Sequence, residues 1–99
     1  MEEIHGLKIR YAPAAQRDLA SIFAYLAERS PQAKRLVAAR LSNAILLIAD
    51  NPAIGVRTQR PGIFVKFVPK SAYKIFYRIQ EETIEVIHIR HSSRRPWLF

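Results

Sequence analysis

The last tenth of the chain gathers residue types that often carry proton transfer and anion binding. The stretch HIRHSSRRPW, residues 88–97, contains two histidines, three arginines, two serines and a tryptophan. Imidazole groups exchange protons near neutral pH, and guanidinium groups bind phosphates and carboxylates. The stretch could therefore be a nuclease site, a basic segment that binds a target, or a solvated tail. The secondary-structure elements around it distinguish these three interpretations.

Spacing argues against two other kinds of site. His88 and His91 are three residues apart in an expected strand, so their side chains point to opposite faces and do not chelate one metal ion. His5 stands alone near the N-terminus, and Ser92 and Ser93 have no acid–histidine relay at a recognisable spacing. We expect no metal, no cofactor and no serine nucleophile. The absence of cysteine also excludes disulfides and thiolate chemistry.

Length and composition indicate one globular domain over residues 1–99, with a core of its own. No apolar run approaches the ~20 residues of a membrane span, so we expect a cytoplasmic protein without a membrane partner. The net charge is +8, and its excess lies in residues 34–80, which hold nine Lys and Arg against one acid. Such a basic chain should attract phosphates or acidic protein surfaces, although solubility alone could also explain the charge.

The hydrophobic pattern predicts the elements that must position the C-terminal stretch. Residues 6–13 alternate as a half-buried strand, and apolar residues at helical spacing follow in 14–30 and 32–50. Ser30 and Pro31 end the first helix and begin the second, as an N-cap and a first-turn proline. After a connection over 53–62, three strands follow: 63–69, 72–80 and 83–91. The order β-αα-βββ predicts an α+β fold with a helical hairpin packed on one face of a small, mostly antiparallel sheet.

Alternation along the last two strands assigns their side chains to faces. In 72–80 one face holds Tyr73, Ile75, Tyr77 and Ile79, which we expect in the core, and the other holds Lys74, Phe76 and Arg78. In 83–91 we expect Ile87 and Ile89 to meet the helices, with the opposite face formed by Ile84, Val86, His88 and Arg90. His88 and Arg90 should then join Lys74 and Arg78 on a basic face.

The same residues resemble a known family. The order β-αα-βββ, the stretch NPAIGVRTQRPGIFVKFVPKSAYKIFYRI and the terminal IEVIHIRHSSRRPW are similar to the RelE/ParE superfamily of bacterial type II toxins, most of all its ParE or plasmid-stabilisation branch. The likeness runs from Lys8 to Trp97. It rests on the combination of Tyr-x-Ile-Phe-Tyr-Arg with His-x-Arg-His and Arg-Arg-Pro-Trp, since no single piece is specific.

The resemblance implies a toxin that a cognate antitoxin neutralises by binding across its surface. It leaves two activities open, because RelE-type toxins cut mRNA in the ribosomal A site whereas ParE-type toxins inhibit DNA gyrase. We expect inhibition of DNA gyrase by binding, without catalysis, and a ParD-like antitoxin. The first alternative is a ribosome-dependent mRNA endonuclease that needs no metal. The second is a non-toxic basic module that binds nucleic acid.

Cleavage of mRNA needs a base for the 2′-OH, an acid for the leaving 5′-oxygen and cations around the phosphate. By resemblance, Lys74 and Arg94 stand where the nuclease branch has arginines. The nuclease branch also has two alternating lysines on the preceding strand, where this sequence has only Lys66. Trp97 cannot transfer a proton at neutral pH. A nuclease would therefore have to use these residues: Lys74, His88, His91 and Arg94.

The sheet face and the C-terminal segment hold the expected binding residues. Target binding is assigned to Lys74, Arg78, His88, Arg90, His91, Arg94, Arg95 and Trp97. Apolar residues that an amphipathic antitoxin helix could cover are Phe76, Trp97, Leu98 and Phe99. Trp97 could equally fold back onto the hairpin as core, and Lys74 and Arg78 could simply be the solvated side of a sheet. Arg57 and Arg60, in the long connection, are expected to be solvated.

Overall fold

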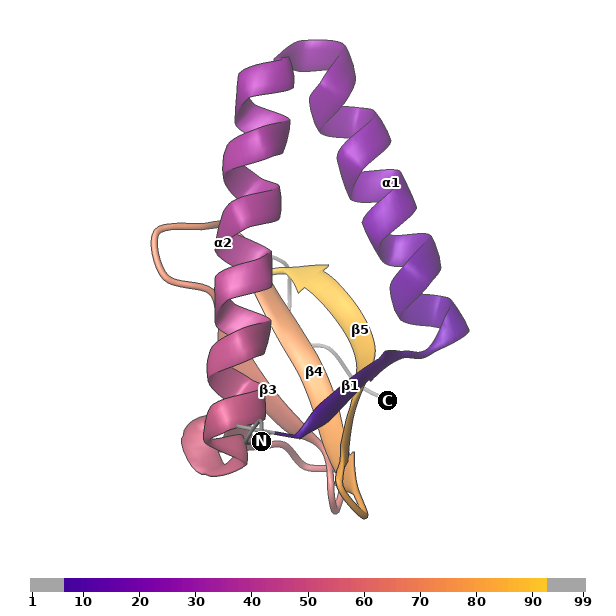
Figure 1. The fold of residues 1–99 in the computed structure, drawn as a ribbon. Helices are drawn as coiled ribbons and strands as arrows, with labels where there is room; N and C mark the ends of the chain where they lie inside the picture. Colours follow the sequence, from indigo (N-terminus) through magenta and orange to yellow (C-terminus); the bar gives the residue numbers. More distant parts are fainter. Residues whose placement is uncertain (1–6, 93–99) are drawn as a thin grey trace, which may run out of the picture.

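The computed structural model describes residues 7–92 and contains each element that the pattern predicts (Figure 1). The elements run in the order β1 Lys8–Tyr11, α1 Pro13–Arg29, α2 Pro31–Asp50, η1 Pro52–Ile54, β2 Val56–Arg57, β3 Phe64–Phe67, β4 Tyr73–Gln80 and β5 Thr83–His91. The sequence pattern missed η1 and β2, which are only three and two residues long. No helix within residues 7–92 is long and apolar enough to cross a membrane.

The five strands form one sheet in the order β1-β5-β4-β3-β2. β1 is parallel to β5, and every other neighbouring pair is antiparallel, which confirms the expected α+β fold. β5 lies between β1 and β4, although β1 pairs with it only as far as Tyr11 opposite Val86. The second half of β5 therefore has no β1 backbone beside it, and its amide groups on that side need other partners.

The helical hairpin forms where the sequence predicts it. The Ser30 side chain accepts a hydrogen bond of 3.1 Å from the Ala33 N–H, and Pro31 occupies the first helical position. The apolar stripe of α2 buries Leu41, Ala44, Ile45 and Ile48. They join a core cluster with Ile75, Tyr77, Ile84, Val86 and Ile89 of the sheet. Helices and strands thus form two layers, with the hairpin on one face of the sheet (Figure 1).

A β-bulge changes the expected faces of β5. Phe76 lies opposite His88 while the next residue, Tyr77, lies opposite Val86, so Ile87 is an extra residue in the ladder. One extra residue reverses the alternation beyond it. The prediction is right for Ile89, which is 2% exposed, but wrong for Ile87, which is only partly buried and lies outside the core cluster. It is also wrong for Ile84 and Val86, which are fully buried against the helices.

Tyr77 connects the sheet to the segment that leads into the long connection. Its ring is fully buried, as expected, and its hydroxyl donates a 2.7 Å hydrogen bond to the Pro52 carbonyl. The same hydroxyl accepts a 3.0 Å bond from the Gly55 N–H. A Cβ atom at Gly55 would lie 2.4 Å from this oxygen, so glycine is required here by close approach. Burial raises the pKa of the Tyr77 phenol.

Candidate functional site

The sheet face opposite the core carries most of the expected site residues in the described chain. We call it the outer face, and the strand register assigns to it Val65, Phe67, Lys74, Phe76, Arg78, Glu85, His88 and Arg90, with Arg10 beside Glu85. The expectation that His88 and Arg90 join Lys74 and Arg78 on one face is therefore met. The bulge at Ile87 precedes His88 on β5 and brings His88 and Arg90 to the outer face. The sequence pattern did not predict this bulge.

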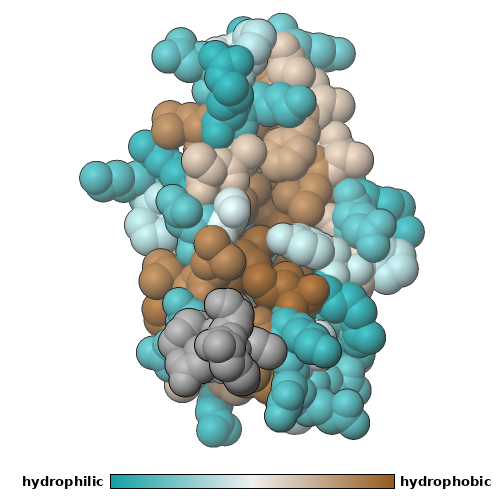
Figure 2. Space-filling view, in the orientation of Figure 1, coloured by the Kyte–Doolittle hydropathy of each residue, from teal (hydrophilic) through white to brown (hydrophobic). Residues whose placement is uncertain are grey.

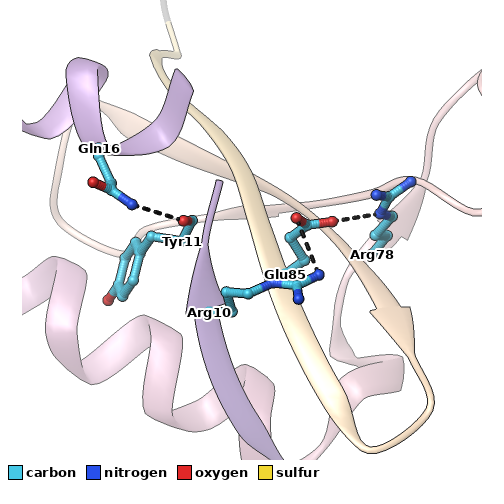
Figure 3. A network of polar contacts seen from close by, with 5 residues as sticks. All are labelled: Arg10, Tyr11, Gln16, Arg78 and Glu85. Atoms are coloured by element: carbon cyan, nitrogen blue, oxygen red, sulfur yellow. Dashed lines mark hydrogen bonds and ion pairs between the residues drawn. The ribbon is translucent and has the colours of Figure 1, made fainter. Parts of the chain in front are cut away.

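Three charged residues from three strands form one cluster on this face (Figure 3). The Arg78 Nε donates to the Glu85 carboxylate at 2.7 Å, and Arg10 reaches the other oxygen of Glu85 at 3.3 Å. Glu85 is only 12% exposed, whereas the two arginine side chains are 58% and 45% exposed. One carboxylate thus holds two guanidinium groups in place, and the cluster keeps a net positive charge.

Lys74 lies between aromatic rings in the middle of the outer face. Its ammonium nitrogen is 5.8 Å from the centroid of the Phe67 ring and 5.7 Å from that of Phe76. The residue is 8% exposed and lies directly opposite Arg90. Two like charges in a cross-strand pair are unfavourable, and the aromatic faces offset part of that cost. Phe67 is 52% exposed, so the face presents a ring together with its cations.

Asp18 of α1 occupies the gap left beside β5 where β1 ends. One of its carboxylate oxygens accepts the Ile89 N–H at 3.0 Å and lies 2.9 Å from Nδ1 of His88. The carboxylate replaces a strand neighbour and also fixes the imidazole ring. Sequence reasoning missed this residue, since 70 positions separate Asp18 from His88 and nothing in their spacing links them.

A pocket of about 240 Å³ opens on the outer face beside His88. Its lining combines the β1–α1 junction, the β2–β3 connection and both central strands: Ala12, Arg60, Ile63, Arg78, Glu85, Ile87 and His88. We call it the outer pocket. It brings Arg60, which we expected to be merely solvated, next to the Arg78–Glu85 pair. Its two guanidinium groups are donors suited to an oxyanion, and the Glu85 carboxylate lies in the same lining.

His91 is on the helix side of the sheet, as the strand spacing predicts. Its ring contacts Tyr73 edge-on at 5.5 Å between centroids, and their backbones are opposite each other in the ladder. His88 and His91 therefore belong to different surfaces and share no site. Within residues 7–92, no group of three metal-binding side chains comes together.

A larger hollow separates the two helices above the end of the sheet. Its volume is about 590 Å³, and we call it the helix groove. Its lining comes from both helices, the β3–β4 loop and the end of β5: Ile22, Tyr25, Leu26, Val37, Arg40, Lys70, Ser71, Ala72, Tyr73 and His91. Figure 2 shows apolar surface along the centre of this side of the molecule, between hydrophilic margins. The groove is therefore lined by apolar side chains together with the basic residues Arg40 and Lys70.

Several expected site residues cannot be placed on either surface. Arg94, Arg95, Trp97, Leu98 and Phe99 lie outside the described residues, so their roles stay predictions. Phe76, expected to contact an antitoxin, is on the outer face but only 4% exposed.

The comparisons with known proteins agree with the fold. Residues 9–96 match the family described as the ParE toxin of the type II toxin–antitoxin system parDE. No curated protein has significant sequence similarity to the chain. Among solved structures, a chain of the chromosomal ParDE toxin–antitoxin system from P. aeruginosa has a TM-score of 0.76 at 14% identity, over 89% of this chain and 98% of that one.

Two RelE-type structures are also similar in fold. A chain of the RelBE2 toxin–antitoxin complex from Mycobacterium tuberculosis gives a TM-score of 0.61 at 22% identity, over 92% of this chain and 97% of that one. The isolated E. coli RelE toxin gives 0.61 at 13% identity, over 89% and 86%. Because the family match covers nearly the whole chain, this protein belongs to the ParE toxin family of type II toxin–antitoxin systems.

Proposed function

We propose that this toxin acts by binding and inhibiting DNA gyrase, and that a ParD-like antitoxin neutralises it. The observation that carries the proposal is the ParE family match over residues 9–96. The resemblance of the sequence to the ParE branch implies gyrase as the target. Both gyrase and the ribosome are cytoplasmic targets, so we expect the protein to act in the cytoplasm.

The positions of Lys66 and Lys74 favour binding of a target over cleavage of mRNA. Lys66 lies opposite Ile75, whose side chain is in the core, so its own side chain is on the helix side of the sheet. Lys74 is on the outer face, and the two therefore do not contribute to one phosphate site. Lys74 is also held beside two aromatic rings, and Glu85 engages Arg78. Such a face suits contact with a partner better than paired proton transfer.

A supercoiling assay run beside a translation assay tests the target. Purified toxin should block supercoiling of relaxed plasmid by DNA gyrase or trap cleaved DNA, and it should leave mRNA on translating ribosomes intact. Adding the cognate antitoxin should restore supercoiling, which excludes a contaminant. Ribosome-dependent cleavage of mRNA with normal supercoiling would reject gyrase as the target.

We propose that the antitoxin occupies the helix groove. Its apolar lining suits an amphipathic helix, and Arg40 and Lys70 in the same lining suit acidic side chains on that helix. Tyr25 lines the groove and is 53% exposed, an unusual exposure for a large aromatic residue. The solved relatives from P. aeruginosa and M. tuberculosis belong to toxin–antitoxin systems, which supports an antitoxin partner.

Leu26→Arg should weaken binding of the antitoxin at least about tenfold, because it places an unpaired charge in the apolar lining. Leu36→Arg is the matched control: Leu36 is 49% exposed on α2 and does not line the groove. Isothermal titration of each variant with the cognate antitoxin measures the difference. Equal affinity for both variants would place the antitoxin elsewhere.

A further inference from the structure

We propose that two copies of this chain associate through the solvent-facing side of α2, with the two helices antiparallel. This goes beyond the proposed function, because neither gyrase nor an antitoxin takes part in the contact. The proposal rests on the exposure, the spacing and the charge of one helix face.

The side of α2 that faces away from the core is unusually apolar for a surface helix. Leu36, Leu46 and Leu47 are 49%, 55% and 48% exposed, whereas a surface helix normally carries polar residues on this side. The opposite side of the same helix holds its buried residues: Leu41, Ala44, Ile45, Ile48 and Ala49. In Figure 1 α2 runs in front of the strands, and no other described element lies over it. A helix that is apolar on both sides is expected to have a partner on both.

The exposed positions of α2 repeat with the spacing of a two-stranded coiled coil. We call them the α2 seam, and all of its members are exposed: Gln32, Leu36, Ala39, Asn43, Leu46 and Asp50. Successive members are alternately four and three residues apart. This is the heptad a/d pattern, in which side chains of one helix fit between those of another. The pattern therefore favours a helix as the partner, and the α2 of a second copy presents the matching seam.

Asp50 favours the antiparallel arrangement. A parallel pair would place this carboxylate beside the same carboxylate of the second copy, and two like charges repel. In an antiparallel pair with Leu36 opposite Leu46 of the second copy, Asp50 lies opposite Gln32, in the first turn of the other helix. The Gln32 amide can donate to the carboxylate, and the positive end of the helix dipole attracts it. At the end of its own helix Asp50 gains nothing from the dipole, so the second copy supplies a stabilisation that the monomer lacks.

The same register is consistent along the whole seam. Leu36 meets Leu46 in the outer layers, and Ala39 meets Asn43 in the inner ones. An asparagine in such a seam lowers the stability of the pair but fixes its register. The seam is about 27 Å long at 1.5 Å per residue. So short a contact lies at the low end of specific interfaces, so we expect a dissociation constant on the order of 10–100 µM.

The α2 seam and the helix groove are separate surfaces. Among the described residues, α2 contributes Val37 and Arg40 to the groove, and neither belongs to the seam. Self-association therefore leaves the groove lining out of the contact. Variants of the seam and variants of the groove should accordingly have different effects.

Sedimentation velocity of the purified toxin alone tests the proposal. The mass should rise with concentration from the 11.4 kDa of one chain toward twice that value. Leu36→Arg and Leu46→Arg should each weaken association at least about tenfold, because each places a charge in an apolar layer. Phe67→Arg is the matched control: it adds the same charge at a residue 52% exposed on the outer face and should change association less than about twofold.

Asn43→Leu tests the seam by a gain that loss of folding does not imitate. Because the amide lowers the stability of the pair, its replacement by leucine should tighten association at least about tenfold, and the product should remain a dimer. Thermal melting at low concentration confirms that each variant is folded.

Disulfide trapping determines the direction of the helices, since the chain contains no cysteine of its own. In the antiparallel pair residue 36 is next to residue 46 of the second copy. It is about 15 Å along the axis from its own counterpart, which is too far for a disulfide. An oxidised mixture of the Leu36→Cys and Leu46→Cys chains should therefore form the mixed cross-linked dimer, and each variant alone should form little. The reverse result would mean parallel helices and would overturn the arrangement.

Three outcomes would overturn self-association through α2. They are a monomer at concentrations up to about 200 µM, an equal loss in Phe67→Arg, and no tightening in Asn43→Leu. Leu26→Arg, which tests the helix groove, should associate as the unmodified chain does, and a loss there would assign self-association to the groove. If the toxin stayed monomeric and Leu46→Arg weakened antitoxin binding, the antitoxin would be the occupant of this face. Because the assay contains only the toxin, its result is independent of the target and of the antitoxin.

Discussion

Replacing Tyr77 by alanine is expected to lower the free energy of unfolding by about 4–5 kcal/mol, enough to unfold a marginally stable domain. The ring is fully buried among core residues of both layers, so its removal leaves a cavity. The Pro52 carbonyl and the Gly55 N–H also lose their hydrogen bonds to the Tyr77 hydroxyl. Urea denaturation followed by circular dichroism measures the change.

Tyr77→Phe separates the two contributions. It keeps the ring and should cost only about 1–3 kcal/mol, because two partly buried backbone groups lose their partner. Its effect should also depend on pH. Burial raises the pKa of Tyr77, so the stability that this tyrosine contributes is complete below about pH 10 and is lost as the pH rises toward the folded-state pKa. The phenylalanine variant should lose less stability in alkaline solution. An alanine variant as stable as Tyr77→Phe would contradict the cavity argument.

Replacing Asp18 by alanine is expected to lower the free energy of unfolding by about 2–3 kcal/mol. One carboxylate oxygen serves both the Ile89 N–H and the His88 ring, and the side chain is 18% exposed. Hydrogen bonds to a charged group contribute more than neutral ones, and the Ile89 amide on the open side of β5 would lose its partner. Amide hydrogen exchange at Ile89 should become faster in the same variant.

Asp18→Asn is the graded comparison, because its amide oxygen can still accept from the Ile89 N–H. It should cost less than the alanine variant and should largely preserve protection of that amide. Glu28→Ala provides a control for loss of an acid on the same helix at an exposed position. If Asp18→Ala and Glu28→Ala were equally stable, the bridge between α1 and β5 would contribute nothing.

Local sequence signals determined the elements and the type of fold. The alternation in residues 72–80 and the helical stripe of residues 32–50 predicted both layers, because burial on one side imposes a period that tertiary contacts only reinforce. Ser30 and Pro31 predicted the break between the helices for the same local reason, since capping involves residues three positions apart. The family resemblance rested on these elements and on the terminal motifs, and the ParE match confirms it.

Only the tertiary structure decided where the last strand presents its side chains. The bulge at Ile87 reversed the predicted faces of Ile84 and Val86, since one extra residue depends on how two strands pair and leaves no mark in either strand alone. The bridge from Asp18 to His88 also depends on strand pairing, because Asp18 contacts β5 just beyond the point where β1 ends. The sequence therefore determined that HIRH carries histidines on opposite faces. The structure decided that one of them is held by a carboxylate 70 positions away and borders an arginine-lined pocket.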